Sequence, residues 1–372
     1  MRILVHRERN KTQPNIPKSV NEVIIPEEYS RIDDRQFLIG HFIENGVCVI
    51  VFTTKENCRL LNTAHYWLMD GTFSSCTEPF VQIYTIHAPV GASSGTHKVV
   101  PLVYGLLSHK TEECYKIFLE LLKRFAVNKL KINLDPPIII TDFETAAINA
   151  VKTMFPECLN KLCFFHLTQT IWRHIQAAGL ARRYSNDPEF AHKMLIPEEA
   201  EEILTWFETY YVRGTAQVTK NFSSRMTVRR RQPKFPPAMW SVCDSHRSQI
   251  PLSQNALESW HNRWNILLGR RKWNVFKTVS EFIKEQKHSE CLIEQINSSA
   301  PMPRRKPKWQ CLRERITQYV SEKNDMNFKD YLTWLTYVIC SNDLFFSYYV
   351  QEIIYAVIIV EGTKNIVLLS IL

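Results

Sequence analysis

The sequence has no long uninterrupted apolar run, no internal repeat and no excess of acidic residues. Its most apolar segment, LFFSYYVQEIIYAVIIV, is broken by Gln351 and Glu352 and falls short of the ~20 clean residues of a membrane helix. The opening MRILVHRERNK is basic and lacks the apolar core of a secretory signal peptide. We therefore expect no membrane partner, and we expect the ten cysteines to be reduced thiols inside a cell.

The composition is that of a globular protein with a basic balance. Hydrophobic residues make up 45% and charged residues 22%, and 372 residues are enough for two structural units or one domain with a large insertion. Lys and Arg (46) outnumber Asp and Glu (37), which gives a formal net charge of +9. This balance favours a polyanionic partner, with nucleic acid as the first candidate.

Strand patterns dominate residues 37–108. The stretch FLIGHFIENGVCVIVFTT predicts a β-hairpin that turns at ENG. Runs rich in β-branched and aromatic residues, bounded by Gly, Pro or Ser, occur in residues 61–73, 80–91 and 99–108. These runs predict three successive antiparallel strands.

A helical period follows in residues 111–127, with Thr111 as the expected N-cap. The apolar residues of its inward face are Tyr115, Phe118, Leu119, Leu122 and Phe125. Ile138–Ile140 then predicts a short strand that leads into a second helix, and KLCFFHL predicts another strand. The inward residues of the second helix are Ile148, Val151 and Phe155. The order β-β-β-α-β-α-β predicts a mixed α/β sheet flanked by helices.

Helical segments separated by Pro and Gly predict an α-helical insertion after this sheet. The predicted organisation is an N-terminal extension with a β-hairpin, a core in two parts, the insertion, and a basic helical C-terminal region with an atypical apolar tail. In that order the ranges are 1–62, 63–166 with 251–290, 167–250, and 291–372.

Two acidic residues stand at the ends of predicted strands. Asp70 ends the apolar run YWLM, and Asp142 follows three isoleucines and Thr141. Burying a charge is costly unless something pairs with it. Gly71 would let the chain turn away after Asp70. Asp142 could instead be a helix N-cap, because a helix follows it. Two such acids in one sheet favour a functional site, since open α/β sheets gather their sites at strand carboxyl ends.

A third acid, Glu258, lies on the predicted helix SQNALESWHNRWN. The apolar stripe of that helix consists of Leu257, Trp260, Trp264, Leu267 and Leu268. Beside it, at helical spacing from Glu258, lie the polar residues Asn255, His261, Asn262 and Asn265. A solvent-facing stripe normally carries Lys and Glu, so this one favours the lining of a site, with an ordinary exposed face as the alternative.

Three carboxylates suit the hard cations Mg²⁺ or Mn²⁺. Two such ions about 3.5–4 Å apart can activate an attacking oxygen and stabilise a leaving oxygen in phosphodiester chemistry. We expect Asp70 and Asp142 to hold the metals and Glu258 to complete the coordination. An anionic substrate matches the basic chain.

Several motifs together resemble the transposase domain of Mutator-like elements (MULE transposases) over about residues 20–290. They are WLMDGTF, FVQIYTIHA, VVPLVYGLLSHKTEECYKIFLELL, IIITDFETAAINAVKTMFP, CFFHLTQTIWRHI and NALESWHNRWN. The resemblance implies a DDE-type transposase with an RNase H-like core and a helical insertion before the last acid. It also implies that Asp70, Asp142 and Glu258 are the catalytic acids. The sequence departs from the family pattern in LSQNALE, where Gln254 replaces an asparagine, and in the lack of a FLYWCH-type zinc finger.

The resemblance further implies a role near the active site or the DNA end for Cys163 and His166, the Cys-x2-His pair of CFFH. A zinc ion would need about two more ligands, and Cys243 and His246 offer a second pair at the same spacing. We expect a pair without zinc. His87 either faces the metals or is a core histidine with a satisfied hydrogen bond.

Positive charge is concentrated in RMTVRRRQPK, LGRRKW and PRRKPKW. Lys and Arg contacts to phosphates give sequence-independent, salt-sensitive affinity. Solvated charge runs or a nuclear-import signal are the alternatives, and we expect a nuclear location. The DNA-binding candidates are Arg229, Arg230, Arg231, Arg270, Arg271 and Lys272.

The first hypothesis is therefore a metal-dependent transposase that cleaves DNA and transfers strands during DNA-mediated transposition. Its partners are DNA, both transposon ends and target, and we allow a homo-oligomer. The second hypothesis is a domesticated descendant that binds DNA or chromatin without cutting it. The third is a structural nuclear protein with no DNA role.

Overall fold

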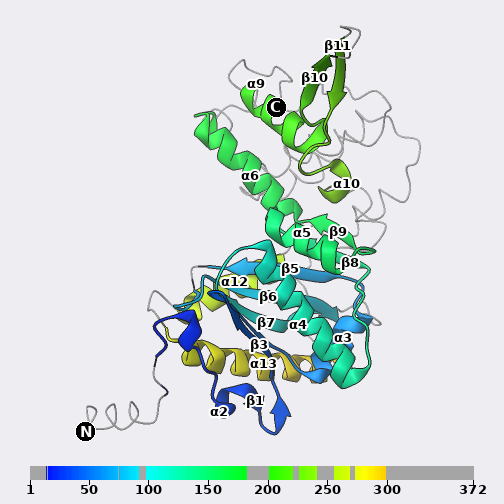
Figure 1. Cartoon of the computed structure of the whole chain (residues 1–372). Coiled ribbons are helices and arrows are strands. Elements are labelled where there is room, and N and C mark those ends of the chain that lie inside the picture. The colour runs from blue at the N-terminus through cyan, green and yellow to red at the C-terminus, as the bar shows by residue number, and fades with distance from the viewer. Residues whose placement is uncertain are drawn as a thin grey trace. The chain divides into compact units, whose positions relative to one another are not determined.

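The computed structural model describes residues 14, 16–73, 75–91, 98–181, 201–220, 226–240, 255–268 and 273–298. The chain divides into two compact units. Figure 1 shows the chain coloured by residue number, from blue at the N-terminus to red at the C-terminus. The first unit consists of residues 1–161 and 254–302, and the second of residues 162–253 and 303–372.

A seven-stranded sheet forms the centre of the first unit, in the order β3-β4-β7-β6-β5-β8-β9 (Figure 1). Its strands are β3 (Leu38–Glu44), β4 (Val47–Phe52), β5 (Trp67–Thr72), β6 (Gln82–Val90), β7 (Lys98–Leu107), β8 (Ile138–Thr141) and β9 (Leu159–Leu162). β5, β6 and β7 are antiparallel neighbours, as predicted, whereas β5 and β8 run parallel. The predicted mixed α/β sheet is confirmed.

The predicted hairpin is formed by β3 and β4. Its turn uses Asn45 and Gly46, whose φ angles of 51° and 79° are the positive values that a tight two-residue hairpin turn needs. β4 also pairs with β7, so the hairpin is part of the main sheet. The main sheet therefore extends across the boundary predicted at residue 63. The continuous apolar run of β4 is typical of a strand that is covered on both faces.

Short elements precede the sheet. They are the 3₁₀ turn η1 (Val20–Glu22), α2 (Glu27–Ser30), β1 (Arg31–Ile32) and β2 (Arg35–Gln36). β1 and β2 form a separate antiparallel pair.

Three helices cover one face of the sheet: α3 (Lys55–Thr63), α4 (Glu112–Leu130) and α5 (Thr145–Met154). The sequence patterns did not predict α3, although Thr54 caps it by accepting a hydrogen bond from Asn57 N at 3.1 Å. α4 begins after Thr111, whose hydroxyl accepts from Cys114 N at 3.3 Å, as predicted. All five residues of the predicted inward face of α4 are buried.

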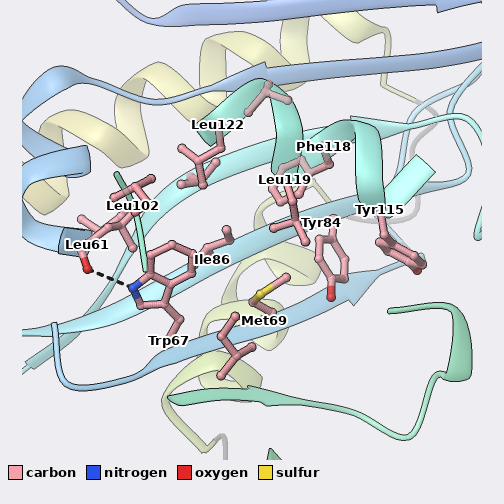
Figure 2. Packing of buried hydrophobic residues seen from close by; sticks show 14 of the residues in the cluster. Leu61, Trp67, Met69, Tyr84, Ile86, Leu102, Tyr115, Phe118, Leu119 and Leu122 are labelled. Atoms are coloured by element: carbon pink, nitrogen blue, oxygen red, sulfur yellow. Dashed lines mark hydrogen bonds between the residues drawn. The ribbon is translucent and has the colours of Figure 1, made fainter. Parts of the chain in front are cut away.

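Figure 2 shows the core between α4 and the sheet. Trp67 packs at its centre, and its indole Nε1 donates to Leu61 O at 3.0 Å. Phe155 meets the Trp67 ring edge-on, with centroids 5.6 Å apart. Ile148 and Val151 of α5 are buried as predicted, so this helix also faces the sheet.

The opposite face is covered by α12 (Asn255–Leu268) and α13 (Val275–Asn297). Leu257, Trp260 and Trp264 are buried, in agreement with the predicted apolar stripe. Leu267 is 50% exposed, so the stripe ends one turn earlier than predicted. The Trp264 ring stacks between Trp260 at 4.9 Å and Phe282 of α13 at 5.4 Å, which fixes α12 on α13.

The second unit contains α6 (Phe164–Ala177), α9 (Glu201–Phe207), the π-helical turn η4 (Glu208–Val212) and α10 (Pro237–Trp240). It also contains an antiparallel hairpin of β10 (Ala216–Lys220) and β11 (Met226–Arg230). The predicted α-helical insertion therefore contains a β-hairpin besides its helices. The alternation of Thr and Val in AQVTK and MTVRR is a strand pattern, but the arginine run beside it directed the interpretation to charge.

The predicted strand KLCFFHL is divided between two elements. β9 ends at Leu162, and α6 starts at Phe164. Among the helices that the structure describes, none has both the length and the apolar character to cross a membrane. The apolar segment LFFSYYVQEIIYAVIIV lies outside the described residues.

Candidate active site

Asp70 lies inside β5 and not at its tip. The strand continues through Gly71 and Thr72, and Asp70 is paired with Thr85 of β6. Only 6% of Asp70 is exposed, and its Oδ1 accepts a hydrogen bond from Gly71 N at 2.7 Å. The acid is thus rigidly held by the sheet on both sides.

The predicted role of Gly71 as a turning point is wrong, because this residue stays in the strand. It is instead a position with no room for a side chain. A Cβ atom there would lie 2.6 Å from Gln82 Oε1 and 3.2 Å from Tyr84 Cδ2. Glycine is required here by the close approach of the β6 side chains.

Asp142 follows the last residue of β8 and precedes α5. Its Oδ1 accepts from Glu144 N at 3.1 Å, whereas the N-cap residue of α5 is Glu144 itself. Asp142 therefore shapes the turn between strand and helix without being the N-cap. This result disfavours the alternative that Asp142 is present only as a helix N-cap.

The parallel register brings the two aspartates together. Leu68 is paired with Ile140 and both strands run in the same direction, so Asp70 and Asp142, each two residues further along, lie at the same end of this strand pair. Their charges act on one another. The pKa of Asp70 is raised well above the usual carboxyl value, first by burial and then by the charge of Asp142.

The helix α12 faces this point of β5. His261 Nδ1 lies 3.6 Å from Asp70 Oδ2, and Asn265 Oδ1 lies 3.5 Å from the hydroxyl of Thr72. The charge of Glu258 also contributes to the raised pKa of Asp70. These three members of the predicted polar stripe thus lie on the side of the helix that faces the acid. Asn262 is exposed, and the side chain of Asn255 lies outside the described residues.

Glu258 itself is half-buried. Burial raises the pKa of its carboxyl group, and within the described part of the chain its Oε1 is buried without a hydrogen-bond partner. Leaving such an oxygen unpaired costs about 1–3 kcal/mol, so the site gains from a ligand that can pair with it.

α12 is fastened to α13 through Glu285, which is 5% exposed. Its Oε1 accepts from Trp260 Nε1 at 2.9 Å and from the guanidinium of Arg263. Charge-assisted hydrogen bonds are about twice as strong as neutral ones. Glu285 therefore fixes the helix that presents Glu258 and His261 to β5.

Four residues at this edge were not predicted from the sequence. Glu144 lies two positions after Asp142, and its charge adds to the raised pKa of Asp70. The Glu144 carboxylate is hydrogen-bonded to the Tyr115 hydroxyl, which also accepts from Gln82 Nε2 at 2.8 Å. The sequence signal for Glu144 was its short spacing from Asp142 in TDFET. Gln82, Tyr84 and Tyr115 gave no comparable signal, because they lie in ordinary strand and helix patterns.

His87 is a core histidine, the second of the two predicted alternatives. It is 1% exposed, its Nε2 lies 3.1 Å from Thr85 Oγ1, and its ring meets Trp260 edge-on at 5.3 Å. Burial lowers the pKa of His87 well below the usual value, so the ring is neutral at physiological pH.

Cys163 and His166 lie in the second unit, at the start of α6. Cys163 is buried and is the N-cap residue, and His166 follows in the first turn. Cys243 and His246, the second pair considered for zinc, lie outside the described residues.

The donor set at Asp70 is compatible with a hard cation. The acids that act on Asp70 offer oxygen atoms only, and one of these oxygens, Glu258 Oε1, is buried and unpaired among the residues described. As they stand, no three His, Cys, Asp or Glu side chains of the described residues are grouped closely enough to hold a metal ion. A cation would thus draw the acids together.

The DNA-binding candidates are only partly described. Arg230 ends β11 and Arg231 follows it, and both are exposed. Arg229 lies in β11, but its side chain is outside the described part of the chain. Arg270, Arg271 and Lys272 are outside it altogether.

Residues 66–170 match the family described as the MULE transposase domain. The stretch runs from the residue before β5 into α6, so it contains both aspartates but not Glu258. The predicted resemblance to the transposase domain of Mutator-like elements is confirmed over these residues. No match is found among curated proteins.

Proposed function

We propose that this protein is a DDE-type DNA transposase whose acids Asp70, Asp142 and Glu258 hold Mg²⁺ or Mn²⁺ for phosphodiester hydrolysis and strand transfer. The observation that carries the proposal is the parallel pairing of β5 with β8, which brings the two acids to the same end of this strand pair, with His261 of α12 beside Asp70. Both acids belong to the stretch that matches the MULE transposase domain.

The arrangement of elements supports an RNase H-like core. A β-meander of β5, β6 and β7 is followed by α4, and the next strand, β8, pairs parallel to β5. The first acid lies on β5 and the second directly after β8. The third, Glu258, comes from α12, beyond the second unit in the sequence.

Bound divalent cations supply a Lewis acid that stabilises the charge of the attacking and leaving oxygens. In hydrolysis, a water oxygen forms a bond to phosphorus, the bond from phosphorus to the 3′-oxygen breaks, and that oxygen leaves as a 3′-hydroxyl. In strand transfer, this 3′-hydroxyl attacks a target phosphodiester, and a target 3′-hydroxyl leaves. Asp70 and Asp142 would hold the cations that position the reacting phosphate, and Glu258 of α12 would complete their coordination.

The partner is DNA, both element ends and target, and the location that suits it is the nucleus. Arg230 and Arg231, exposed at the end of β11, are candidates for phosphate contacts. Binding that rests on such contacts weakens steeply as the salt concentration rises.

A non-cutting DNA-binding descendant is the second candidate. It is favoured by one observation: among the described residues, the acids are not already grouped as a metal site. Retention of DNA binding without cation-dependent cleavage would distinguish it from the first candidate.

The test is strand cleavage and joining with the full chain. The substrates are a supercoiled plasmid and a labelled duplex with a free 3′-hydroxyl, with Mg²⁺ or Mn²⁺ added. Asp142→Asn should lower the rate about 100-fold or more, since the cation contributes several kcal/mol to the transition state. Asp135→Asn, at the exposed residue 135 before the same strand, is the matched control and should retain the wild-type rate. Equal activity of Asp142→Asn and wild type would end the proposal.

A further inference from the structure

Phe73 and Lys110 form an exposed pair at one end of the main sheet. Phe73 follows the last residue of β5 and is 43% exposed, and Lys110 comes shortly after β7 and is also exposed. The ammonium nitrogen of Lys110 lies 2.9 Å from the centroid of the Phe73 ring, which is a cation–π contact. An aromatic face and a positive charge thus meet at the surface.

The strand directions place this pair at the same end of the sheet as the two aspartates. β5 and β8 run parallel, and β7 runs in the direction of β5 because both are antiparallel to β6. Phe73, Lys110 and Asp142 therefore all lie beyond strand ends on the same side of the sheet. Phe73 is three residues from Asp70, so their Cα atoms are at most about 11 Å apart.

Hydrogen bonds join the first turn of α4 to the turn that carries Asp142. The Tyr115 hydroxyl is bonded to Glu144, whose backbone N donates to Asp142 Oδ1 at 3.1 Å. In addition, Glu112 Oε2 accepts from Asn149 Nδ2 of α5 at 3.1 Å. The start of α4, which directly follows the Lys110 segment, is thus fixed beside the turn between β8 and α5.

Negative charge is concentrated at this end of the sheet. The charges of Asp142, Glu258 and Glu144 all act on Asp70. A DNA phosphate that approaches these carboxylates is repelled by them, so a lysine beside them favours its binding. The partner that the structure describes for the Lys110 ammonium group is the Phe73 ring, which a base could occupy from its exposed side.

We propose that Phe73 and Lys110 contact the DNA strand next to the reacting phosphate, with Phe73 stacked on an unpaired base and Lys110 bound to a backbone phosphate. Every base has a face that can stack on an aromatic ring, so this contact recognises an unpaired end without reading its sequence. The flexible stem of lysine lets the ammonium group move from the ring to a phosphate. The inference rests on the proposed function, because it takes DNA at the acids as the substrate.

The test is a fluorescence-anisotropy titration of the full chain with two labelled DNA probes in Ca²⁺, a hard cation that binds oxygen ligands. One probe is a blunt duplex, and the other is the same duplex with three unpaired nucleotides at its 3′ end. Gel electrophoresis of the recovered probes checks that they stay intact. Wild type should bind the unpaired end about tenfold more tightly than the blunt end, the size expected for stacking of one base.

The two side chains should contribute in different ways. Phe73→Ala should lose the preference for the unpaired end, whereas Phe73→Trp should keep it, because tryptophan also stacks on bases. Lys110→Gln should weaken binding of both probes about fivefold and should reduce the slope of log Kd against log salt concentration by about 0.9, as for one lost phosphate contact.

Val127→Ala and Lys129→Gln are the matched controls. Both residues are exposed near the C-terminal end of α4, and Val127 is 43% exposed, like Phe73. A helix of 19 residues is about 28 Å long, so these positions are far from Lys110. Both variants should bind the two probes as wild type does.

The outcomes separate the inference from the proposed function. If wild type binds both probes equally, or if Phe73→Ala keeps the preference for the unpaired end, the inference is wrong and the proposed function stands. If Val127→Ala loses the preference as Phe73→Ala does, the effect is not local and the inference is again wrong. If wild type binds neither probe, the DNA partner of the proposed function fails, and the inference fails with it.

Discussion

Replacing Asp70 with asparagine should make the protein more stable when divalent cations are removed. Asp70 is 6% exposed, and Asp142 directly follows β8, the parallel strand next to β5. Asparagine keeps a carbonyl oxygen that can accept the hydrogen bond from Gly71 N. The substitution therefore removes a buried charge while preserving the local backbone contact.

The size of the effect follows from the strand geometry. Two unit charges at the ~4.8 Å spacing of neighbouring strands repel by about 3 kcal/mol at an effective dielectric constant of about 20. Asparagine also loses the attraction of His261, whose Nδ1 is 3.6 Å from Asp70 Oδ2. We expect a net gain of about 1–2 kcal/mol in the free energy of unfolding at pH 7.5.

The gain should depend on pH. The folded protein holds the Asp70 proton more tightly than the unfolded chain, because the folded pKa is raised above the ordinary value of 3.8. The contribution of Asp70 to wild-type stability is therefore largest below that ordinary value and declines as the pH rises through the raised pKa. Asp70→Asn lacks this decline, so the two proteins should approach one another near pH 4.

Urea unfolding in EDTA, followed by tryptophan fluorescence at pH 4 and pH 7.5, measures both effects. Saturating Mn²⁺ at pH 7.5 should reverse the order, since a ligand at 100 times its Kd adds about 2.7 kcal/mol to wild type alone. Asp135→Asn is the control for removal of an exposed acid. The reasoning is refuted if Asp70→Asn is less stable than wild type in EDTA at pH 7.5, or if its gain is the same at both pH values.

Two further predictions concern the residues that hold the acids in place. Gly71→Ala should lower the free energy of unfolding by about 1–3 kcal/mol, because the new Cβ would lie 2.6 Å from Gln82 Oε1; a variant as stable as wild type in urea would contradict this close packing. Glu285→Ala should cost about 1–3 kcal/mol, because it leaves the buried indole N–H of Trp260 without its acceptor. Glu294→Ala, at an exposed position of the same helix, is the control, and its free energy of unfolding should stay within about 0.5 kcal/mol of wild type. Equal losses of stability in the two variants would show that Glu285 has no special role.

The sequence was most informative where one physical pattern dominated a segment. All five residues that the helical period of residues 111–127 predicted for the inward face of α4 are buried, because a helix packed on a sheet buries one stripe. Cys114 and Ala126 beside them are buried as well. The ENG turn predicted the β3–β4 hairpin, since Asn and Gly adopt the positive φ values that it needs.

Patterns failed where tertiary packing or charge decided the structure. α3 is short and polar, so its helical period was weak beside the strong strands on either side. The β10–β11 hairpin was hidden by its arginines. In α3 the local pattern was weak, whereas in β10 and β11 a strand pattern was present but the adjacent charge outweighed it in the interpretation.

The candidate site was predictable in part. Asp70 and Asp142 each follow an apolar run, and this suggested that they share a sheet edge. The parallel register that makes them neighbours is a long-range pairing that the sequence does not display. The close approach of Tyr84 to Gly71 is also a long-range contact. Gly71 suggested a turn, but it lies in a strand where the neighbouring β6 side chains leave no room for a Cβ atom.

The most direct test of the account is the position of Mn²⁺ in crystals of the wild-type protein, located by anomalous diffraction. We expect a peak in contact with carboxylate oxygens of both Asp70 and Asp142, with Glu258 turned toward it, and no such peak in Asp142→Asn. Manganese bound elsewhere on the chain, or no manganese at these two aspartates, would contradict it.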